Sequence, residues 1–175
     1  MNAYLAVVSK REVRRYLPRP IPEEALEQIV QAGRASGSSR NRQPWRFITV
    51  TDRTILRDLA AFVFRPANLE GCAAAIAVVL TNPRAQFDAG RTAQNMMLAA
   101  WSLGIGSCPN TPADEAAMRE RLEIPAEMSV STVLSLGYPA QGEPRPHADA
   151  DPAAKLTRIN RLPLAELLHR ETFRA

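Results

Sequence analysis

The stretch that decides the fold reads Ser36-Gly37-Ser38-Ser39-Arg40-Asn41-Arg42-Gln43-Pro44-Trp45-Arg46-Phe47. It is a run of small, polar residues that ends abruptly at an aromatic, β-prone segment. Gly37 can adopt a positive φ, and the serines can bond nearby backbone N–H groups, so we expect a loop. Its many short donors and acceptors, with little bulk, suit a flat polar ring or a sugar chain. The alternative is an ordinary connection between a helix and a strand.

Regular elements are expected on both sides of this loop. A helix begins at Ile21-Pro22-Glu23-Glu24, where proline and acids favour a helix start, and it runs toward the loop at residues 35–44. Its buried stripe is Leu26, Ile29, Val30 and Gly33. A strand follows at residues 45–51, and Asp52 then caps a helix over about 53–62. A short helix is also expected at residues 3–10.

The second half of the chain predicts a buried core. Residues 74–81 form a continuous apolar run, which favours a strand covered on both faces. Residues 88–103 predict a long helix, ended by Gly104, that is apolar around most of its circumference. Such a helix must be buried inside a core or against a second subunit. A helix at 113–122 and a strand at 130–137 follow.

After Tyr138 the composition changes to a proline-rich tail. Gly142 and Pro139, Pro144, Pro146 and Pro152 are expected to break regular structure, and only a short helix at about 163–170 follows. The apolar end of the tail needs a surface to pack on, and a partner subunit is one candidate.

Composition limits the class of protein. At 175 residues, with 46% hydrophobic and 23% charged residues, the chain is expected to be one globular domain. No apolar run reaches the length of a membrane span and no signal peptide opens the chain, so we expect a cytoplasmic protein and no membrane partner. Cys72, Cys108, His147 and His169 show no ligand spacing, so neither a metal site nor a disulfide is expected.

The net charge of +4 comes almost entirely from arginine, because Lys10 and Lys155 are the only lysines. Arginine binds phosphate through two parallel hydrogen bonds, which makes a phosphorylated ligand plausible. The arginines are spread along the chain between acids, and no basic stripe indicates a nucleic-acid partner.

Four positive charges gather in the segment Lys10-Arg11-Glu12-Val13-Arg14-Arg15-Tyr16. Lys10, Arg11 and Arg14 would converge on a phosphate if the segment formed a tight turn. The alternative is a charged helix end that faces water.

Together these segments resemble the nitroreductase family of FMN enzymes, in its short compact form. The loop resembles the family's Ser-Ser-x-Asn-x-Gln-Pro-Trp signature, and the N-terminal cluster resembles its R-R-S-x-R-x-F motif, with Glu12 in place of the common Ser. Residues 90–107 resemble the central helix and the turn after it, residues 137–139 the end of the last core strand, and residues 160–163 the tail. The likeness covers about residues 9–168 in the family's order.

The resemblance implies an α+β nitroreductase-like fold, a mainly antiparallel sheet flanked by helices in an intertwined homodimer. Residues 1–175 would form one domain, whose extended tail (138–175) packs on the partner subunit. It also implies FMN as cofactor, and NADH or NADPH as the hydride donor in a ping-pong reaction. The small-molecule acceptor would be a nitroaromatic, a quinone or a similar compound.

The same resemblance assigns the site residues. Lys10, Arg11 and Arg161 would neutralise the phosphate, and Arg14 would lie near the pyrimidine edge of the flavin. The loop, with Ser38, Ser39 and Asn41, would reach the ribityl chain and ring from the other subunit. The full set of cofactor-binding residues is Lys10, Arg11, Arg14, Gly37, Ser38, Ser39, Asn41, Gln43, Pro109, Asn110, Thr111 and Arg161. Residues 109–111 occupy the place of the segment whose backbone faces flavin N5, and no side chain is expected to be catalytic.

Two alternatives stay open. The first is another enzyme on the same fold, a reductive dehalogenase or a flavin-fragmenting synthase of the cobalamin lower ligand. The acid at Glu12 favours the synthase, whereas the compact length does not. The second is a flavin-binding or redox-sensing module without catalysis.

Overall fold

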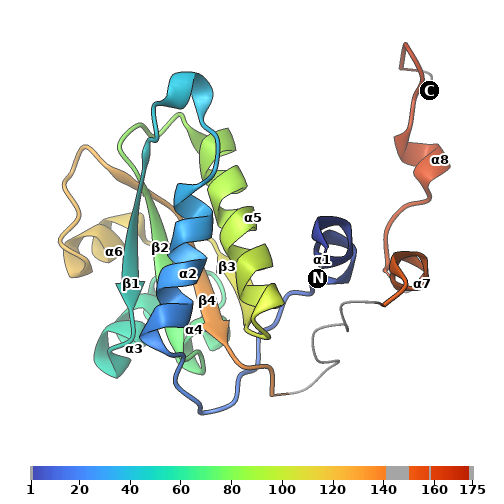
Figure 1. Ribbon diagram of the computed structural model, residues 1–175. Coiled ribbons are helices and arrows are strands. Elements are labelled where there is room, and N and C mark those ends of the chain that lie inside the picture. The colour runs from blue at the N-terminus through green and yellow to red at the C-terminus, as the bar shows by residue number, and fades with distance from the viewer. Residues whose placement is uncertain (1, 141–149, 158, 174–175) are drawn as a thin grey trace.

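A four-stranded antiparallel sheet forms the centre of the molecule, in the computed structural model that describes residues 2–140, 150–157 and 159–173. Its strands, in spatial order, are β1 (Trp45–Val50), β2 (Ala74–Leu80), β4 (Ser129–Gly137) and β3 (Gly106–Asn110). The helices are α1 (Ala3–Ser9), α2 (Glu23–Arg34), α3 (Arg53–Ala61), α4 (Ala67–Glu70), α5 (Gln86–Ser102), α6 (Glu115–Arg121), α7 (Pro152–Leu156) and α8 (Leu164–Leu167), with a 3₁₀ turn η1 at Ser39–Asn41. Figure 1 shows helices on both faces of the sheet.

Strand β2 connects the two halves of the core, because every one of its residues is buried. Ile76, Val78 and Leu80 pack on the face covered by α2 and α5. Ala77 and Val79 pack on the opposite face, with α3, α4 and α6. Adjacent residues of a strand point to opposite faces, so one strand serves both clusters. The expectation of a strand covered on both faces and of an α+β antiparallel fold is confirmed.

Several predicted helix ends are also confirmed. The Asp52 carboxylate accepts hydrogen bonds from the backbone N–H groups of Thr54 and Ile55, both at 2.9 Å, and so caps α3. Helix α2 begins at Glu23, directly after Pro22, and carries Glu23 and Glu24 in its first turn. Gly104 follows α5 with a φ of 79°, the left-handed conformation that ends many helices.

One face of the central helix α5 differs from the prediction that the helix is buried around most of its circumference. Met96, Met97, Ala100 and Trp101 are buried within the chain itself, so they need no second subunit to cover them. Arg91, Gln94 and Asn95 are exposed. The helix is therefore a core element with one open polar side.

Three regular elements were not expected. Pro109 lacks a backbone N–H, which hid strand β3, but β3 lies at the edge of the sheet, where Pro109 pairs with β4 and the missing donor is tolerated. Helix α4 is short and lies in a stretch without helical periodicity. Pro152 does not break structure as predicted: it is the first residue of α7, where a missing N–H costs nothing. Gly142, Pro144, Pro146 and His147 lie outside the described residues.

The segment between α1 and α2 runs along the sheet. Glu12 and Ser107 form a parallel bridge, the Val13 N–H donates to the Ser107 carbonyl at 3.0 Å, and Tyr16 pairs with Pro139 beyond β4. Gly106 makes this approach possible, because a Cβ there would lie 2.6 Å from Cβ of Val13. A Cβ on Gly137 would likewise lie 2.7 Å from the ring of Tyr16.

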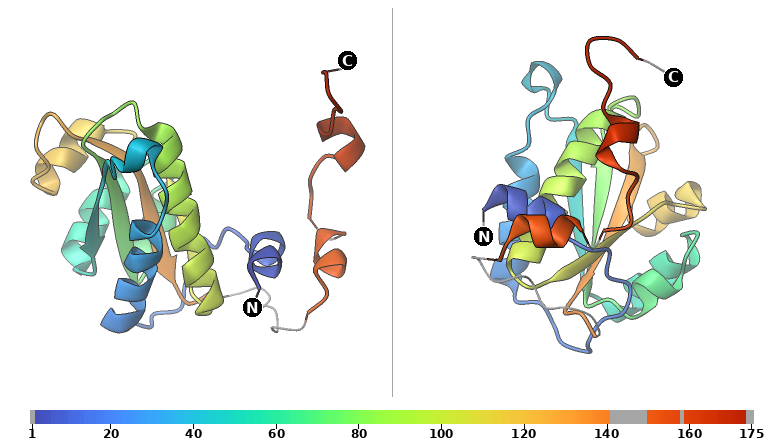
Figure 2. Two further views of the ribbon diagram at one scale, coloured as in Figure 1. Left: turned by 45° about the horizontal axis from the view of Figure 1, so that its top comes forward. Right: turned by 90° about the vertical axis from the view of Figure 1, so that its right-hand side faces the viewer.

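The tail leaves the main body. Helix α7 lies beside α1, whereas α8 extends away from the sheet and its helices (Figures 1 and 2). Ile159 is half-buried, but five large apolar side chains after it are between 49% and 80% exposed; they are Leu162, Leu164, Leu167, Leu168 and Phe173. The predicted helix at 163–170 is present as the shorter α8.

Two glycine substitutions test the close approach of the N-terminal segment. Gly106→Ala forces a methyl group into Val13, and we expect it to lower the free energy of unfolding by about 1–3 kcal/mol. Gly90→Ala is the matched control, because nothing lies within 4 Å of its Cβ position on helix α5. It should raise stability by about 0.5–1 kcal/mol. Urea unfolding at one fixed protein concentration measures both, and equal effects would contradict the packing described.

Candidate functional site

A cavity of about 510 Å³ lies at the end of β3 and combines residues from three parts of the chain. Four predicted site residues line it: Arg14, Pro109, Asn110 and Thr111. Four residues that were not predicted to bind the cofactor complete the wall: Phe64, Arg65, Asn68 and Cys108, which adjoins the predicted segment. The structure therefore brings Arg14 to the segment 109–111, which lies far from it in sequence.

The backbone fixes this arrangement. Phe64 N–H donates to the carbonyl of Thr111 at 3.4 Å, and Val63 bridges Pro112, so the turn before α4 lies against the end of β3. Pro66 in that turn is the one sequence signal that would have found this wall, because proline is frequent where a helix begins.

Asn110 is 3% exposed, and its side chain forms a buried polar network. Its Nδ2 donates to the carbonyls of Cys108 and Val133, both at 3.0 Å, and lies 3.2 Å from Oγ of Ser135. Its Oδ1 accepts from Nδ2 of Asn68 at 2.9 Å. The amide thus ties strands β3 and β4 to helix α4 and holds the backbone of residues 108–110 in place.

Tyr16 extends the network from the other side. Its hydroxyl lies 2.9 Å from Oγ of Ser135 and also bonds the carbonyl of Val13. Burial raises the pKa of the Tyr16 phenol well above its usual range, so the group stays neutral. The network anchors the N-terminal segment that carries Arg14.

Cys108 presents a thiol toward the same cavity. Burial raises the pKa of this thiol, and the nearby guanidinium of Arg14 only partly opposes that effect. A protonated thiol is a weak nucleophile, which agrees with a packing role.

The cavity is positively charged. Arg14 and Arg65 line it, and none of the described lining residues is acidic. Glu12 is turned away onto Lys10, whose Nζ donates to Glu12 Oε1 at 2.6 Å. The side chain of Lys10 is only 6% exposed, and its Nζ also lies 3.5 Å from Sδ of Met97. Arg11 is exposed and its guanidinium donates to the carbonyls of Val8 and Lys10.

The polar loop is a second, separate group of predicted residues. Arg40, Asn41 and Gln43 have positive φ angles of 53°, 54° and 48°, and Gln43 N–H donates to Oγ of Ser38 at 2.8 Å. Gly37 lies close to helix α5, since a Cβ there would lie 2.8 Å from Nη2 of Arg91, the mobile end of an exposed side chain.

The loop does not meet the Arg14 cavity within one chain. Its residues Ser39 and Arg42 lie beside Phe87 and Asp88 at the N-terminal end of α5, and no loop residue lines the Arg14 cavity. Arg161 is also apart: it is exposed in the tail, its Nη1 donates to the Asn160 carbonyl, and no described contact joins it to Lys10 or Arg11.

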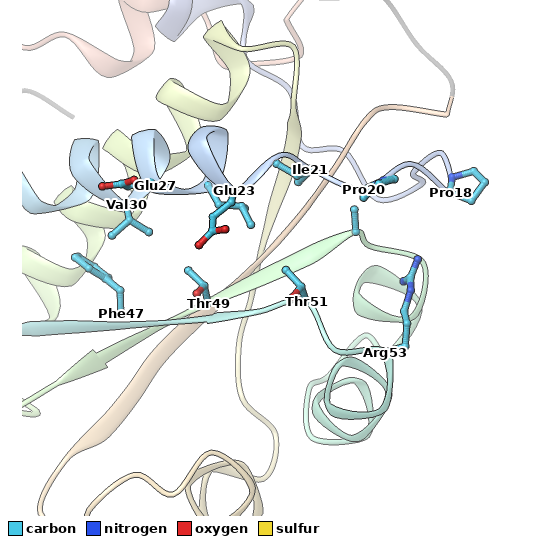
Figure 3. A pocket seen from close by; sticks show the side chains of 12 residues that line it. Pro18, Pro20, Ile21, Glu23, Glu27, Val30, Phe47, Thr49, Thr51 and Arg53 are labelled. Carbon is cyan, nitrogen blue, oxygen red and sulfur yellow. The ribbon is translucent and has the colours of Figure 1, made fainter.

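A larger groove of about 810 Å³ runs between α2 and the edge strand β1 (Figure 3). Ile21 and Val30 face Phe47 and Thr49 across it, and none of the predicted cofactor-binding residues lines it. The groove follows the outer edge of β1, which among the described strands pairs with β2.

The described ranges contain neither a membrane-spanning helix nor a metal site. No described helix combines the length and the apolar character needed to cross a membrane. Among the same residues, no three His, Cys, Asp or Glu side chains gather closely enough to hold a metal ion.

Comparisons with known proteins identify the family. The model of the nitroreductase family matches residues 7–79 and 79–138. An Archaeoglobus fulgidus protein with the provisional name NADH dehydrogenase/NAD(P)H nitroreductase is 37% identical over 145 residues, which is 76% of this chain and 83% of that protein.

Solved structures agree. The NADPH:FMN oxidoreductase of Vibrio harveyi, in complex with NAD⁺, superposes with a TM-score of 0.80 at 26% identity, over 99% of this chain and 79% of that one. Nitroreductase A of Vibrio parahaemolyticus has a TM-score of 0.80, also at 26% identity, over 100% of this chain and 78% of that one. The fold is that of an α+β oxidoreductase. The chain belongs to the nitroreductase family.

The buried amide network gives a direct test of the site's framework. Asn110→Ala leaves Nδ2 of Asn68 and several acceptors without partners, so we expect a loss of about 2–3 kcal/mol in the free energy of unfolding. Asn95→Ala is the control, since it removes a single bond to Ser36 at an exposed position and should cost about 1 kcal/mol or less. Urea titration compares the two, and an equal loss would show that the network does not hold the strands.

Proposed function

We propose that this oxidoreductase is an FMN-dependent NAD(P)H enzyme that reduces a nitroaromatic, a quinone or a similar small acceptor. The observation that carries the proposal is the cavity at the end of β3, with two guanidiniums, no acid and a rigid wall at residues 108–111. Such a site suits a flat ring that becomes anionic on reduction. The names of the relatives, NAD(P)H nitroreductase and NADPH:FMN oxidoreductase, support the same reaction class.

The residues present fit FMN. Arg11 and Arg14 are exposed near each other in sequence, and Glu12 is neutralised by Lys10, so no free carboxylate on this segment opposes a phosphate. We assign the phosphate to Lys10, Arg11 and Arg161, and the ring edge to Arg14. FMN would supply the hydride chemistry itself, accepting two electrons from a nicotinamide and passing them to the acceptor in a ping-pong reaction.

The chain's own residues then bind and orient. Asn110 and Asn68 fix the segment that faces the ring, and Arg14 stabilises negative charge there. Gly37, Ser38, Ser39, Asn41 and Gln43 lie on a loop outside this cavity, so we assign them to the flavin of a second subunit. This assignment explains why the two groups of predicted residues remain apart in one chain.

The purified protein should be yellow, with a non-covalent flavin that runs as FMN on chromatography. It should oxidise NADH or NADPH when a quinone is present. FAD carries an adenosine beyond the phosphate of FMN, and we propose no pocket for an adenosine of the flavin. Release of FAD would therefore contradict the assignment. Flavin without turnover would favour a binding or sensing module. Breakdown of the reduced flavin in oxygen would favour the lower-ligand synthase.

Two variants locate the phosphate in the same experiment. Arg11→Ala and Arg161→Ala each remove a charge-assisted bond and should weaken FMN retention by about one to two orders of magnitude. Arg57→Ala, an exposed arginine on α3, is the control and should retain FMN fully. Full occupancy of both site variants after dialysis would show that the phosphate lies elsewhere.

We also propose that the tail packs on a partner subunit in a homodimer. Phe173 is 80% exposed and Leu164 is 71% exposed, which is more apolar surface than a free tail normally presents to water. Arg161 has no described contact with the cations of its own chain, and the groove beside the outer edge of β1 offers an apolar surface for a partner's segment.

Deleting residues 150–175 tests this arrangement. We expect flavin and the dimer to be lost together, because the deletion removes Arg161 and the apolar segment at once. Size-exclusion chromatography coupled to light scattering measures the mass, and the flavin absorbance is read on the same peak. A truncated protein that stays a flavin-loaded dimer would contradict the proposal.

A further inference from the structure

A third cavity, of about 380 Å³, lies at the N-terminal end of α5, away from the Arg14 cavity. It is formed by the polar loop, through Ser39 and Arg42, and by the turn and first residues of α5, through Arg84, Phe87 and Asp88. No role assigned so far uses Arg84, Phe87 or Asp88.

Asp88 is the unusual residue of this cavity. It is 8% exposed and lies in the first turn of α5, and no hydrogen bond or ion pair joins its carboxylate to another described residue. The carboxylate oxygens are not among the buried polar atoms without a partner, so they reach the solvent of the cavity. Arg42 and Arg84 line the same cavity, yet neither lies within ion-pair distance of Asp88. The carboxylate is therefore available to a ligand that donates hydrogen bonds.

The other lining residues indicate which chemical groups that ligand would carry. The two guanidiniums suit phosphate oxygens. Phe87 is 80% exposed and offers a flat aromatic face beside them. Hydroxyl donors, a phosphate and a flat ring occur together in a nucleotide, and the cavity volume falls within the roughly 300–1,000 Å³ of small-molecule sites.

We infer that this cavity binds the adenosine diphosphate end of the nicotinamide donor, with Asp88 on the ribose hydroxyls, Arg42 and Arg84 on the phosphates, and Phe87 against the adenine. The inference rests on the proposed function, in which the loop that carries Ser39 reaches a flavin. A carboxylate accepts a bond from a 2′-hydroxyl and repels a 2′-phosphate. The site therefore selects NADH over NADPH.

The test compares two hydride donors on the flavin-loaded protein. NADH carries the adenylate, whereas dihydronicotinamide mononucleotide lacks it. Arg84→Gln and Phe87→Ala, both at exposed positions, should raise the KM for NADH about tenfold and leave the maximal rate and the KM for the mononucleotide unchanged. Arg57→Gln should change neither constant. Asp88→Asn should reduce the preference for NADH over NADPH.

A binding measurement makes the test independent of turnover. Calorimetric titration with AMP should show saturable binding to the wild-type protein that Arg84→Gln and Phe87→Ala weaken by about tenfold. If neither donor reduces a bound flavin, the proposed function fails, while the AMP titration still decides whether this is a nucleotide site.

Three results would overturn the inference. The first is an equal KM for NADH and the mononucleotide in the wild-type protein. The second is a wild-type protein that does not bind AMP. The third is a loss of dimer mass in Arg84→Gln or Phe87→Ala with both KM values unchanged, which would mean that a partner subunit fills the cavity.

Discussion

The complete burial of β2 is the constraint on which the rest of the structure depends. A strand with no exposed residue needs apolar cover on both faces and a hydrogen-bonded neighbour on each side. Helices α2 and α5 supply one cover, and α3, α4 and α6 supply the other. This leaves β1 and β3 as the two edges of the sheet, and each edge borders a cavity.

The two edges differ, and the candidate site follows from that difference. The segment from Glu12 to Leu17 runs along β3 and past the end of β4, which is possible because Gly106 and Gly137 have no side chains. That path brings Arg14 to the end of β3. The amide of Asn110 then ties the strand to α4, so the wall of the cavity is rigid where the chemistry is proposed.

Local signals in the sequence predicted several residues of this site, but not the residues that hold them in place. Arg14 and residues 109–111 could be assigned because each belongs to a recognisable segment. Asn68 could not, because it acts through a hydrogen bond to Asn110, 42 residues away. Strand β3 was hidden for a similar reason: only the sheet shows that Pro109 lies on an edge, where its missing N–H is harmless.

The sequence by itself determined most helices and strands. The signals for them act over a few residues, as do the hydrophobic periodicity, the cap at Asp52 and the helix end at Gly104. The sequence also determined the family, through short segments in a fixed order. Only the tertiary structure decided which charges meet. Lys10 neutralises Glu12, Arg14 faces a cavity without acids, and Asp88 lines a cavity with two arginines without pairing with either. The physical reason is that ion pairing and burial depend on distances of a few ångströms between segments, which local sequence does not specify.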